Sequence, residues 1–299
     1  MTIYIDPPVW PAHGTVFAHL ISDSSLEELH TFAARTGIRR QAFDEDHYDV
    51  PEHRHRDLIA AGATPVSGTE LARILASCGL RVRSVERPTK VRARLLRAWE
   101  RLLDTSDAAV LGEELLDRWA EPHRHYHSPA HLAAVLNAVG VLERAGELPA
   151  ERRRPARLAA WFHDAVDAGA AGQDEEDSAR LAEERLAGLL PAEEVTEVAR
   201  LVRLTATHAP EPGDAAGAVL VDADLEVLGR APAAYRRYTA QVRRDFDHVP
   251  EPLFREGRAR VLATLLERPR LFHTPAGQQL WESAARANLT AELAELRSA

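Results

Sequence analysis

Arg87-Pro88-Thr89-Lys90 is the stretch at which the pattern of apolar residues changes. Before it, short strand-like and helix-like segments alternate, beginning with Thr2 to Asp6, in which apolar and polar residues take turns. From Val91 onward, apolar residues recur at intervals of three and four, which is the helical period. The sequence therefore predicts an α+β protein of two domains: a small α/β domain over residues 1–88 and an all-helical domain over residues 91–299.

The first region carries its own start and stop signals. Ser25-Leu26-Glu27-Glu28 is typical of a capped helix start, and Gly37 can end that helix. Thr69 to Cys78 repeats the helical pattern before Gly79, and Leu80 to Glu86 alternates again as a strand would. This alternation of helix and strand signals predicts a layer of mostly parallel strands.

The composition excludes several classes of protein. A net charge of -9 over 299 residues argues against a protein that binds a nucleic-acid duplex through phosphate contacts. The single lysine, Lys90, does not follow a glycine, so a phosphate-binding loop ending in Gly-Lys-Ser/Thr is absent. The opening residues lack the pattern of a signal peptide, and no apolar run of about 18 residues follows. We therefore expect a cytoplasmic protein without a membrane partner. Cys78 is the only cysteine, which permits no internal disulfide and agrees with a reducing compartment. A homo-oligomer stays open.

Three segments of the second region concentrate histidine and aspartate, the ligands of borderline and hard divalent metals. They are Arg124-His125-Tyr126-His127-Ser128-Pro129-Ala130-His131, Trp161-Phe162-His163-Asp164-Ala165-Val166-Asp167 and Val221-Asp222-Ala223-Asp224-Leu225. Ser128 and Pro129 are typical of a helix start. His131 would then lie in the first turn and His127 just before it.

His163 and Asp164 follow the apolar side of a predicted helix, where burial requires that the pair has a partner. A metal ion would supply one. The plain alternative is a core helix with a capped end, because an adjacent His-Asp pair also arises by chance. The joint pattern favours the metal: a capped helix start with two histidines, an apolar helix ending in His-Asp, and an Ala-Asp pair at another expected helix start, near Asp224.

These motifs resemble the HD superfamily of metal-dependent phosphohydrolases over roughly Leu95 to Leu293. The resemblance is to a bacterial branch of predicted phosphohydrolases, and it rests on five motifs. They are Arg-x-Tyr-His-x-x-x-His, Phe-His-Asp-Ala-Val, Asp-Ala-Asp-Leu-x-x-Leu-Gly, the pair Gly257-Arg258 and the run Ala285-Arg286-Ala287-Asn288-Leu289. The resemblance implies an all-helical, HD-type domain with a divalent metal ion, without distinguishing Mn, Mg, Co, Fe and Zn.

Carried over by position, the resemblance implies four metal ligands, which are His131, His163, Asp164 and Asp224. Asp222 is the alternative to Asp224 as the fourth ligand. His127 matches the histidine that donates a proton in the distantly related cyclic-nucleotide phosphodiesterases, so the resemblance assigns it the role of catalytic acid.

Three further residues are candidates near this site. Asp167, one helical turn beyond Asp164, could orient or deprotonate the attacking water, or it could face solvent. His208 could reach the same pocket or cap a helix at the surface. Arg258 could bind a phosphate of the substrate, although an ion pair with a carboxylate is the commoner explanation for one of many arginines.

The function implied is that of an enzyme, a phosphoric ester hydrolase that acts through a metal-activated water on a small phosphate ester such as a nucleotide. Two alternatives remain open. Some HD proteins are di-iron oxygenases, and a third interpretation is a ligand-sensing or scaffold protein with a metal that is only structural.

The first region also carries a polar set, and it resembles a small bacterial domain family of unknown function over about Thr2 to Glu86. The set consists of Asp6, His13, His19, Asp23, His47, Tyr48 and Asp49. These residues could form a second metal or phosphate site, because ligands gather at strand ends in α/β layers. They could equally be hydrogen-bonding loop residues or a surface that docks the helical domain.

Overall fold

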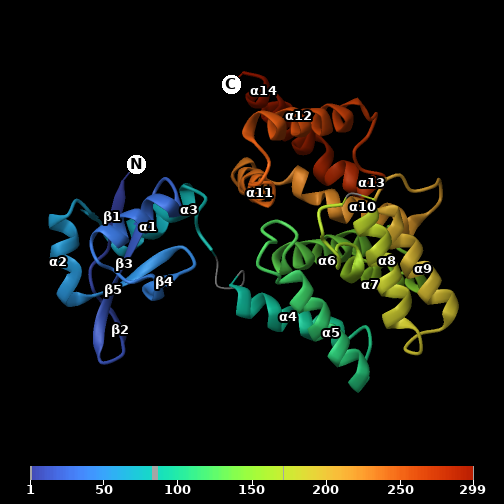
Figure 1. The fold of residues 1–299 in the computed structure, drawn as a ribbon, viewed down its shortest axis with the longest axis horizontal. Coiled ribbons are helices and arrows are strands. Elements are labelled where there is room, and N and C mark those ends of the chain that lie inside the picture. Colours follow the sequence, from blue (N-terminus) through green and yellow to red (C-terminus); the bar gives the residue numbers. More distant parts are fainter. Residues whose placement is uncertain (1, 83–86, 171, 299) are drawn as a thin grey trace. The chain divides into compact units, whose positions relative to one another are not determined.

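The computed structural model describes residues 2–82, 87–170 and 172–298. The chain divides into two compact units, Met1–Arg87 and Pro88–Ala299 (Figure 1). A strand-containing region is thus followed by a helical one. Each unit has buried apolar clusters of its own.

A sheet forms the centre of the first unit, with strand order β4-β5-β3-β1-β6 and β2 paired to β3. The strands are β1 (Ile3–Ile5), β2 (Trp10–Ala12), β3 (Thr15–Ser22), β4 (Phe43–Asp44), β5 (His47–Pro51) and β6 (Thr64–Pro65). Only the β1–β6 pairing is parallel among the strands described. The prediction of mostly parallel strands is therefore wrong.

Short turns explain the antiparallel pairing. His13 and Gly14 join β2 to β3, and both have positive φ, as the two central residues of a tight hairpin turn require. Glu45 has positive φ in the equally short connection from β4 to β5. A parallel pair needs a crossover of about a dozen residues or more, and these connections are far shorter.

Three helices accompany the sheet: α1 (Leu26–Arg35), α2 (Glu52–Ala60) and α3 (Gly68–Ser77). Ser25 caps α1 by accepting the Glu28 N–H, as the sequence predicts, and Gly37 follows its end with φ of 72°. The expected strand over Leu80 to Glu86 does not begin at residues 80–82, and its remaining part, residues 83–86, lies outside the described residues.

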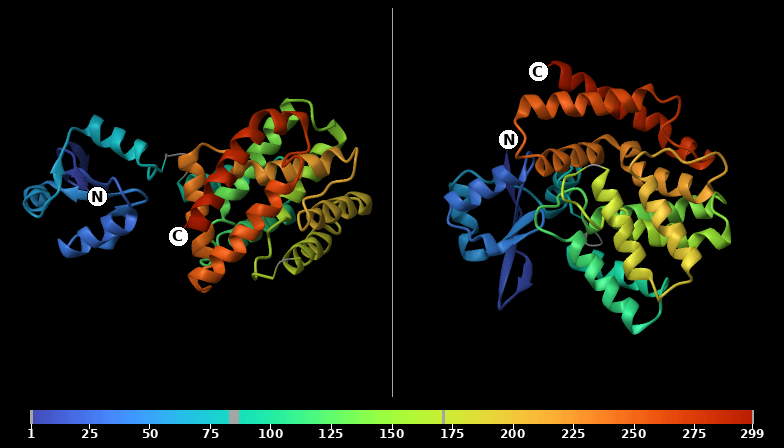
Figure 2. Two further views of the ribbon diagram at one scale, coloured as in Figure 1. Left: turned by 90° about the horizontal axis from the view of Figure 1, so that it is seen from above. Right: turned by 45° about the vertical axis from the view of Figure 1, so that its right-hand side comes forward.

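In the described part of the second unit, the regular secondary structure is helical, apart from one isolated β-bridge. The helices are α4 (Pro88–Glu100), α5 (Ser106–Trp119), α6 (Pro129–Arg144), α7 (Arg153–Phe162), α8 (Gln173–Leu186), α9 (Ala192–Leu204), α10 (Ala215–Asp224), α11 (Pro232–Asp245), α12 (Glu251–Glu267), α13 (Pro275–Gly277) and α14 (Ser283–Ser298), with short 3-10 and π segments between some of them. Helices α11, α12 and α14 gather at one end of the unit (Figure 2). None of the described helices is both long and apolar enough to span a membrane.

Three indoles lie at the centre of the larger core, on α4, α5 and α7. Trp99, Trp119 and Trp161 are all fully buried or nearly so. The rings of Trp99 and Trp161 lie 4.9 Å apart, and the Trp119 indole N–H donates to the Trp161 carbonyl at 3.0 Å. This packing fixes the end of α7, which is the part of the core closest to the candidate site.

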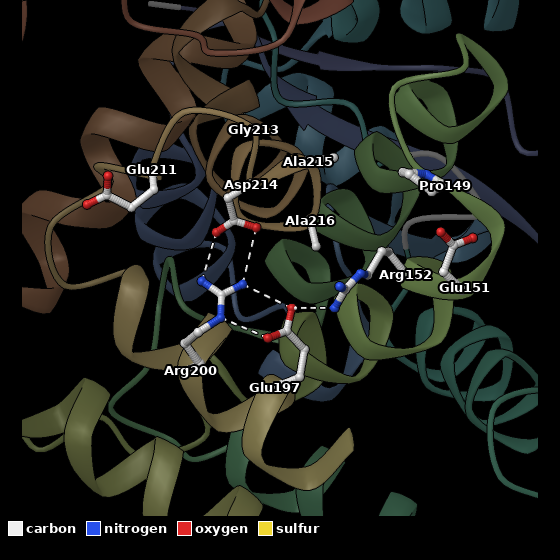
Figure 3. A pocket seen from close by; sticks show the side chains of 10 residues that line it. All are labelled: Pro149, Glu151, Arg152, Glu197, Arg200, Glu211, Gly213, Asp214, Ala215 and Ala216. Carbon is white, nitrogen blue, oxygen red and sulfur yellow. Dashed lines mark hydrogen bonds and ion pairs between the residues drawn. The ribbon is translucent and has the colours of Figure 1, made fainter. Parts of the chain in front are cut away.

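A surface pocket of the helical unit lies between α9, the start of α10 and the loop before α7 (Figure 3). Arg200 reaches across it and donates to both oxygens of Asp214 and both oxygens of Glu197. Asp214 also caps α10 by accepting the Gly217 N–H. The charges that line this pocket are therefore largely satisfied by one another.

Candidate metal centre

Four predicted ligands meet in the interior of the helical unit, contributed by three helix ends. His131 lies in the first turn of α6, His163 and Asp164 directly follow α7, and Asp224 is the last residue of α10. One ligand atom from each of the four lies within 4.8 Å of the others. The structure therefore holds a His/Asp cluster that could bind a metal ion.

The distances show that the donor atoms converge on one point. His131 Nε2 lies 3.1 Å from Asp224 Oδ1, and His163 Nε2 lies 3.0 Å from Asp164 Oδ2. The two Nε2 atoms are 3.4 Å apart. Two imidazole nitrogens that both act as acceptors would repel each other at this distance, and a cation between them would remove that repulsion.

Local structure determines how each imidazole is oriented. The helix start at Ser128 and Pro129 is confirmed, although the Ser128 hydroxyl makes no capping hydrogen bond. Beyond α7, His163 Nδ1 lies 2.9 Å from the Ala160 carbonyl, to which it donates. This bond leaves Nε2 free to accept, as a metal ligand must. The Trp119 ring packs 5.3 Å from the His163 ring and restricts its rotation.

The electrostatics of the cluster are those of carboxylates stabilised by imidazoles. Burial would raise the pKa of Asp224, but the three histidines beside its carboxylate, His131, His163 and His208, lower it well below its usual value. Burial acts the same way on Asp164, where the nearby His163 and His127 lower the pKa. Burial lowers the pKa of His131. Burial acts the same way on His163, but Asp164 and Asp224 raise the pKa of that histidine well above its usual value. A divalent cation would take the place of this proton among two carboxylates and two imidazoles, a donor set that suits it.

Asp222, the alternative fourth ligand, lies outside the cluster. Its side chain is fully buried and accepts hydrogen bonds from the backbone N–H groups of His273 and Thr274 and from the Thr274 hydroxyl. Asp222 therefore fixes the loop before α13, and the structure brings Asp224 to the cluster. The prediction that this motif starts a helix is wrong: both aspartates lie at the end of α10.

His127 and Asp167 lie at the edge of the cluster. His127 Nε2 is 3.7 Å from Asp164 Oδ2, and its Nδ1 is 3.8 Å from Asp167 Oδ2, while 39% of its side chain remains exposed. Burial would lower the pKa of His127, but the two carboxylates offset this and raise it to about 9. Asp167 is not one helical turn beyond Asp164, because α7 has already ended at Phe162.

The two candidates for substrate binding have different surroundings. His208 Nε2 lies 2.8 Å from Asp224 Oδ2, so the structure places it directly behind a predicted ligand. Arg258 instead forms a bidentate ion pair with Glu292 and donates to the Tyr238 hydroxyl. Its guanidinium is committed to these partners, as the alternative explanation from sequence proposed.

Arg124 belongs to the first histidine motif, and the sequence did not indicate a role for it. Its buried guanidinium donates to the carbonyls of Asp164 at 2.6 Å and Ala165 at 3.2 Å. Its Nε donates to Glu121. Arg124 thereby holds the segment after α7 that carries two of the four ligands. An arginine three residues before a predicted catalytic histidine is a signal too general to have assigned this role.

The polar set of the first unit separates into two groups. His19, His47 and Asp49 place one ligand atom each within 4.8 Å of one another. His13 lies in the β2–β3 turn, Asp23 accepts from the Thr2 N–H and the Tyr4 hydroxyl, and Tyr48 contacts His30. Asp6 hydrogen-bonds His19. The sequence thus named the members of this cluster together with residues that have other partners.

Comparison with known proteins informs the first unit. A family described as a protein of unknown function (DUF4031) matches residues 3–78. This match confirms the resemblance of the N-terminal region to a family of unknown function, and it covers the sheet and helices α1 to α3. No curated protein matches the chain. The resemblance of the helical unit to the HD superfamily stays a prediction.

Proposed function

We propose that the helical unit is a metal-dependent hydrolase of phosphate esters, with a small substrate such as a nucleotide. The observation that carries the proposal is the convergence of two imidazoles and two carboxylates within 4.8 Å, beside a histidine that is not one of the four. The proposed ligands are His131, His163, Asp164 and Asp224. A divalent ion bound there would lower the pKa of a water molecule and neutralise charge on phosphoryl oxygens.

His127 is the proposed acid. Its imidazole is partly exposed, and both ring nitrogens face carboxylates, which favour the protonated ring. A protonated imidazole can donate to the leaving oxygen of an ester, a role worth about 10²–10⁴ in rate. Asp167 faces His127 Nδ1, so its proposed task is to orient this ring.

His208 and Arg124 are proposed positioning residues. His208 donates to the Asp224 oxygen that does not face His131, and so holds that carboxylate in one rotamer. Arg124 holds the backbone of Asp164 and Ala165. Partners of this kind orient metal ligands, and their removal typically lowers the metal affinity by about 10- to 100-fold.

The test is phosphate release by the full chain from a panel of nucleotides and sugar phosphates with Mn²⁺, Mg²⁺, Co²⁺, Fe²⁺ or Zn²⁺. His127→Ala should retain the bound metal and lower kcat by about 10² or more. The decrease in kcat should be smaller for an ester with an acidic leaving group, such as a nitrophenyl phosphate, because that group needs less protonation. His125→Ala is the matched control, because the His125 ring is hydrogen-bonded to Asp245 instead.

Three outcomes would contradict the proposal. Loss of substrate that depends on dioxygen, without phosphate release, would identify an oxygenase. A bound metal without turnover of any tested ester would favour a structural metal. Equal losses for good and poor leaving groups in His127→Ala would assign this histidine to substrate positioning.

A further inference from the structure

A second cluster of metal-ligand side chains lies on the sheet of the N-terminal unit. In the antiparallel pairing of β3 with β5, His19 stands opposite Asp49. His47 precedes Asp49 by two residues on β5, so both side chains lie on the same face of the sheet. The register of these two strands therefore brings two imidazoles and a carboxylate together.

The donor atoms of this cluster converge on the Asp49 carboxylate. His47 Nε2 lies 3.5 Å and His19 Nε2 lies 3.9 Å from Asp49 Oδ1. The two imidazole rings are 4.8 Å apart in an edge-on arrangement. Donors around a tetrahedral zinc ion lie roughly 3.3 Å apart, given bond lengths of about 2.0–2.1 Å. Small side-chain rotations would bring the three donors to that spacing.

Each imidazole is held from behind by its own buried carboxylate. His19 Nδ1 lies 3.0 Å from Asp6 Oδ2, and His47 Nδ1 lies 2.6 Å from Asp46 Oδ1. Both aspartate side chains are only 2% exposed. This carboxylate–imidazole pairing is the arrangement that orients histidine ligands of metals, because donation from Nδ1 leaves the Nε2 lone pair facing the ion.

The two supporting carboxylates are themselves anchored by the fold. Asp6 accepts the His19 backbone N–H and the Trp10 indole N–H. Asp46 accepts the Val82 N–H at 2.6 Å. Burial of two carboxylates is costly, and a pair of ordinary surface histidines would not need it. The arrangement is instead what two imidazoles require when both Nε2 atoms must face one point.

We propose that the N-terminal unit binds a borderline divalent metal ion, of the Zn²⁺ or Co²⁺ class, through His19 Nε2, His47 Nε2 and the Asp49 carboxylate. Nitrogen-rich donor sets of this kind favour such ions over Mg²⁺ or Ca²⁺. Asp49 is 44% exposed, so an ion can reach the site from solvent. The site is separate from the cluster of the helical unit, and it does not depend on the function proposed there.

The test is a Co²⁺ titration of the full chain, followed by visible absorption and by metal analysis. Asp49→Asn removes the charge of the exposed ligand at little risk to folding and should weaken binding at this site. His47→Ala should lose one equivalent of metal, and Asp164→Ala in the helical unit should lose a different one. His13→Ala is the matched control, because this histidine lies in the neighbouring turn and should leave the stoichiometry unchanged.

Asp6→Asn supplies a second readout. The His19 backbone bond can persist with the amide, but the charge that supports the His19 imidazole is lost, so Co²⁺ should bind about 10- to 100-fold more weakly. Unchanged stoichiometry and affinity in both His47→Ala and Asp49→Asn would overturn the proposal. The proposal would also be overturned if the wild type bound a single equivalent of metal and only Asp164→Ala lost it. That result would still support metal binding by the helical unit.

Discussion

The two histidine clusters are supported in different ways. In the helical unit, His163 donates to a main-chain carbonyl of its own helix and packs against Trp119, while neighbouring helix ends supply the carboxylates. On the sheet of the N-terminal unit, buried carboxylates support both imidazoles, and the register of two adjacent strands sets their separation. Helix packing positions the first cluster and strand pairing positions the second.

The two clusters should therefore be sensitive to different substitutions. A cluster at helix ends depends on the core that fixes those ends, so substitutions remote from the donors can displace it. A cluster on paired strands depends mainly on the hydrogen bonds behind each imidazole, since the ladder fixes the backbone. Substitutions at helix ends, behind the imidazoles and in the core should therefore affect the two clusters differently.

The largest effect is expected at the end of α10. Asp224→Ala should abolish metal binding by the helical unit and the hydrolytic activity that we propose for it, because this carboxylate contacts both imidazoles of the cluster. Asp222→Ala, two residues away, should instead keep the metal and lower the free energy of unfolding by about 3 kcal/mol, since three buried hydrogen bonds are lost. Metal analysis and urea unfolding of the two variants measure both effects.

The reverse result would contradict the assignment of Asp224 as a ligand. If Asp222→Ala loses the metal and Asp224→Ala keeps it, the fourth ligand is the other aspartate, and α10 must turn relative to α6 when metal binds. Metal binding at the site proposed in the N-terminal unit serves as an internal control in both variants, because its proposed ligands lie in the other unit.

Arg124→Ala should weaken metal binding in the helical unit by about 10- to 100-fold. The guanidinium holds the carbonyls after α7, so its loss frees the segment that carries Asp164. Arg154→Ala is the control, since that arginine pairs with Glu194 at the surface. Isothermal titration with Mn²⁺ or Co²⁺ gives the affinity. If Arg124 has only a structural role, Arg124→Ala should lower the free energy of unfolding of the metal-free protein and leave this affinity unchanged.

The sequence predicted the helical cluster well because its motifs carry local signals. Ser128 and Pro129 mark a helix start, and a His-Asp pair after an apolar helix has few ways to be satisfied. It could not place the end of α10, since Asp222 and Asp224 look alike until packing against the loop of His273 and Thr274 distinguishes them. That information lies in contacts between residues about fifty positions apart.

The sequence predicted the sheet less well. Alternating helix and strand signals indicated parallel strands, but the short turns at His13-Gly14 and Glu45 join their strands as antiparallel hairpins. The same pairing explains why only part of the polar set forms a cluster. The register of β3 and β5 determines that His19 faces Asp49. The sequence of one strand does not specify this register, because it depends on the pairing with the other strand.

Gly112→Ala tests the aromatic support of the helical cluster. An added methyl group would lie 2.4 Å from the Trp99 ring, which cannot move freely because it packs on Trp161. Overpacking of this kind costs about 1–3 kcal/mol and outweighs the gain in helix propensity of about 1 kcal/mol. Gly257→Ala in α12 is the matched control, since a Cβ added there would meet no atom of the described residues within 4 Å, and it should be neutral or stabilising.

Urea unfolding measures both glycine variants. If Gly112→Ala is destabilised while its Mn²⁺ affinity stays at the wild-type value, the indoles stabilise the core without positioning the metal ligands. A stabilised Gly112→Ala would show that the Trp99 ring adjusts at little cost. The N-terminal site should keep its affinity in either variant.

The smallest expected effect concerns Asp214, a carboxylate paired with an arginine instead of an imidazole, and so a reference for both clusters (Figure 3). Asparagine caps helices about as well as aspartate, so Asp214→Asn should keep the bond to the Gly217 N–H and remove only the charge that pairs with Arg200. Because Arg200 is partly exposed, we expect a loss of about 0.5–1 kcal/mol in the free energy of unfolding at pH 7.

The pH dependence of this loss follows from the pKa of Asp214. Burial would raise that pKa, but hydrogen bonds from Arg200 and from the Gly217 N–H lower it below the ordinary value of 3.8. A carboxyl group whose pKa is lower in the folded chain stabilises the fold above its unfolded pKa, and this contribution disappears as pH falls through the folded pKa. The difference between wild type and Asp214→Asn should therefore be constant from pH 7 to pH 5 and shrink below about pH 4. Urea unfolding at these pH values measures the difference. If it grows as pH falls, the protonated form of Asp214 stabilises the fold more than the ionised form does.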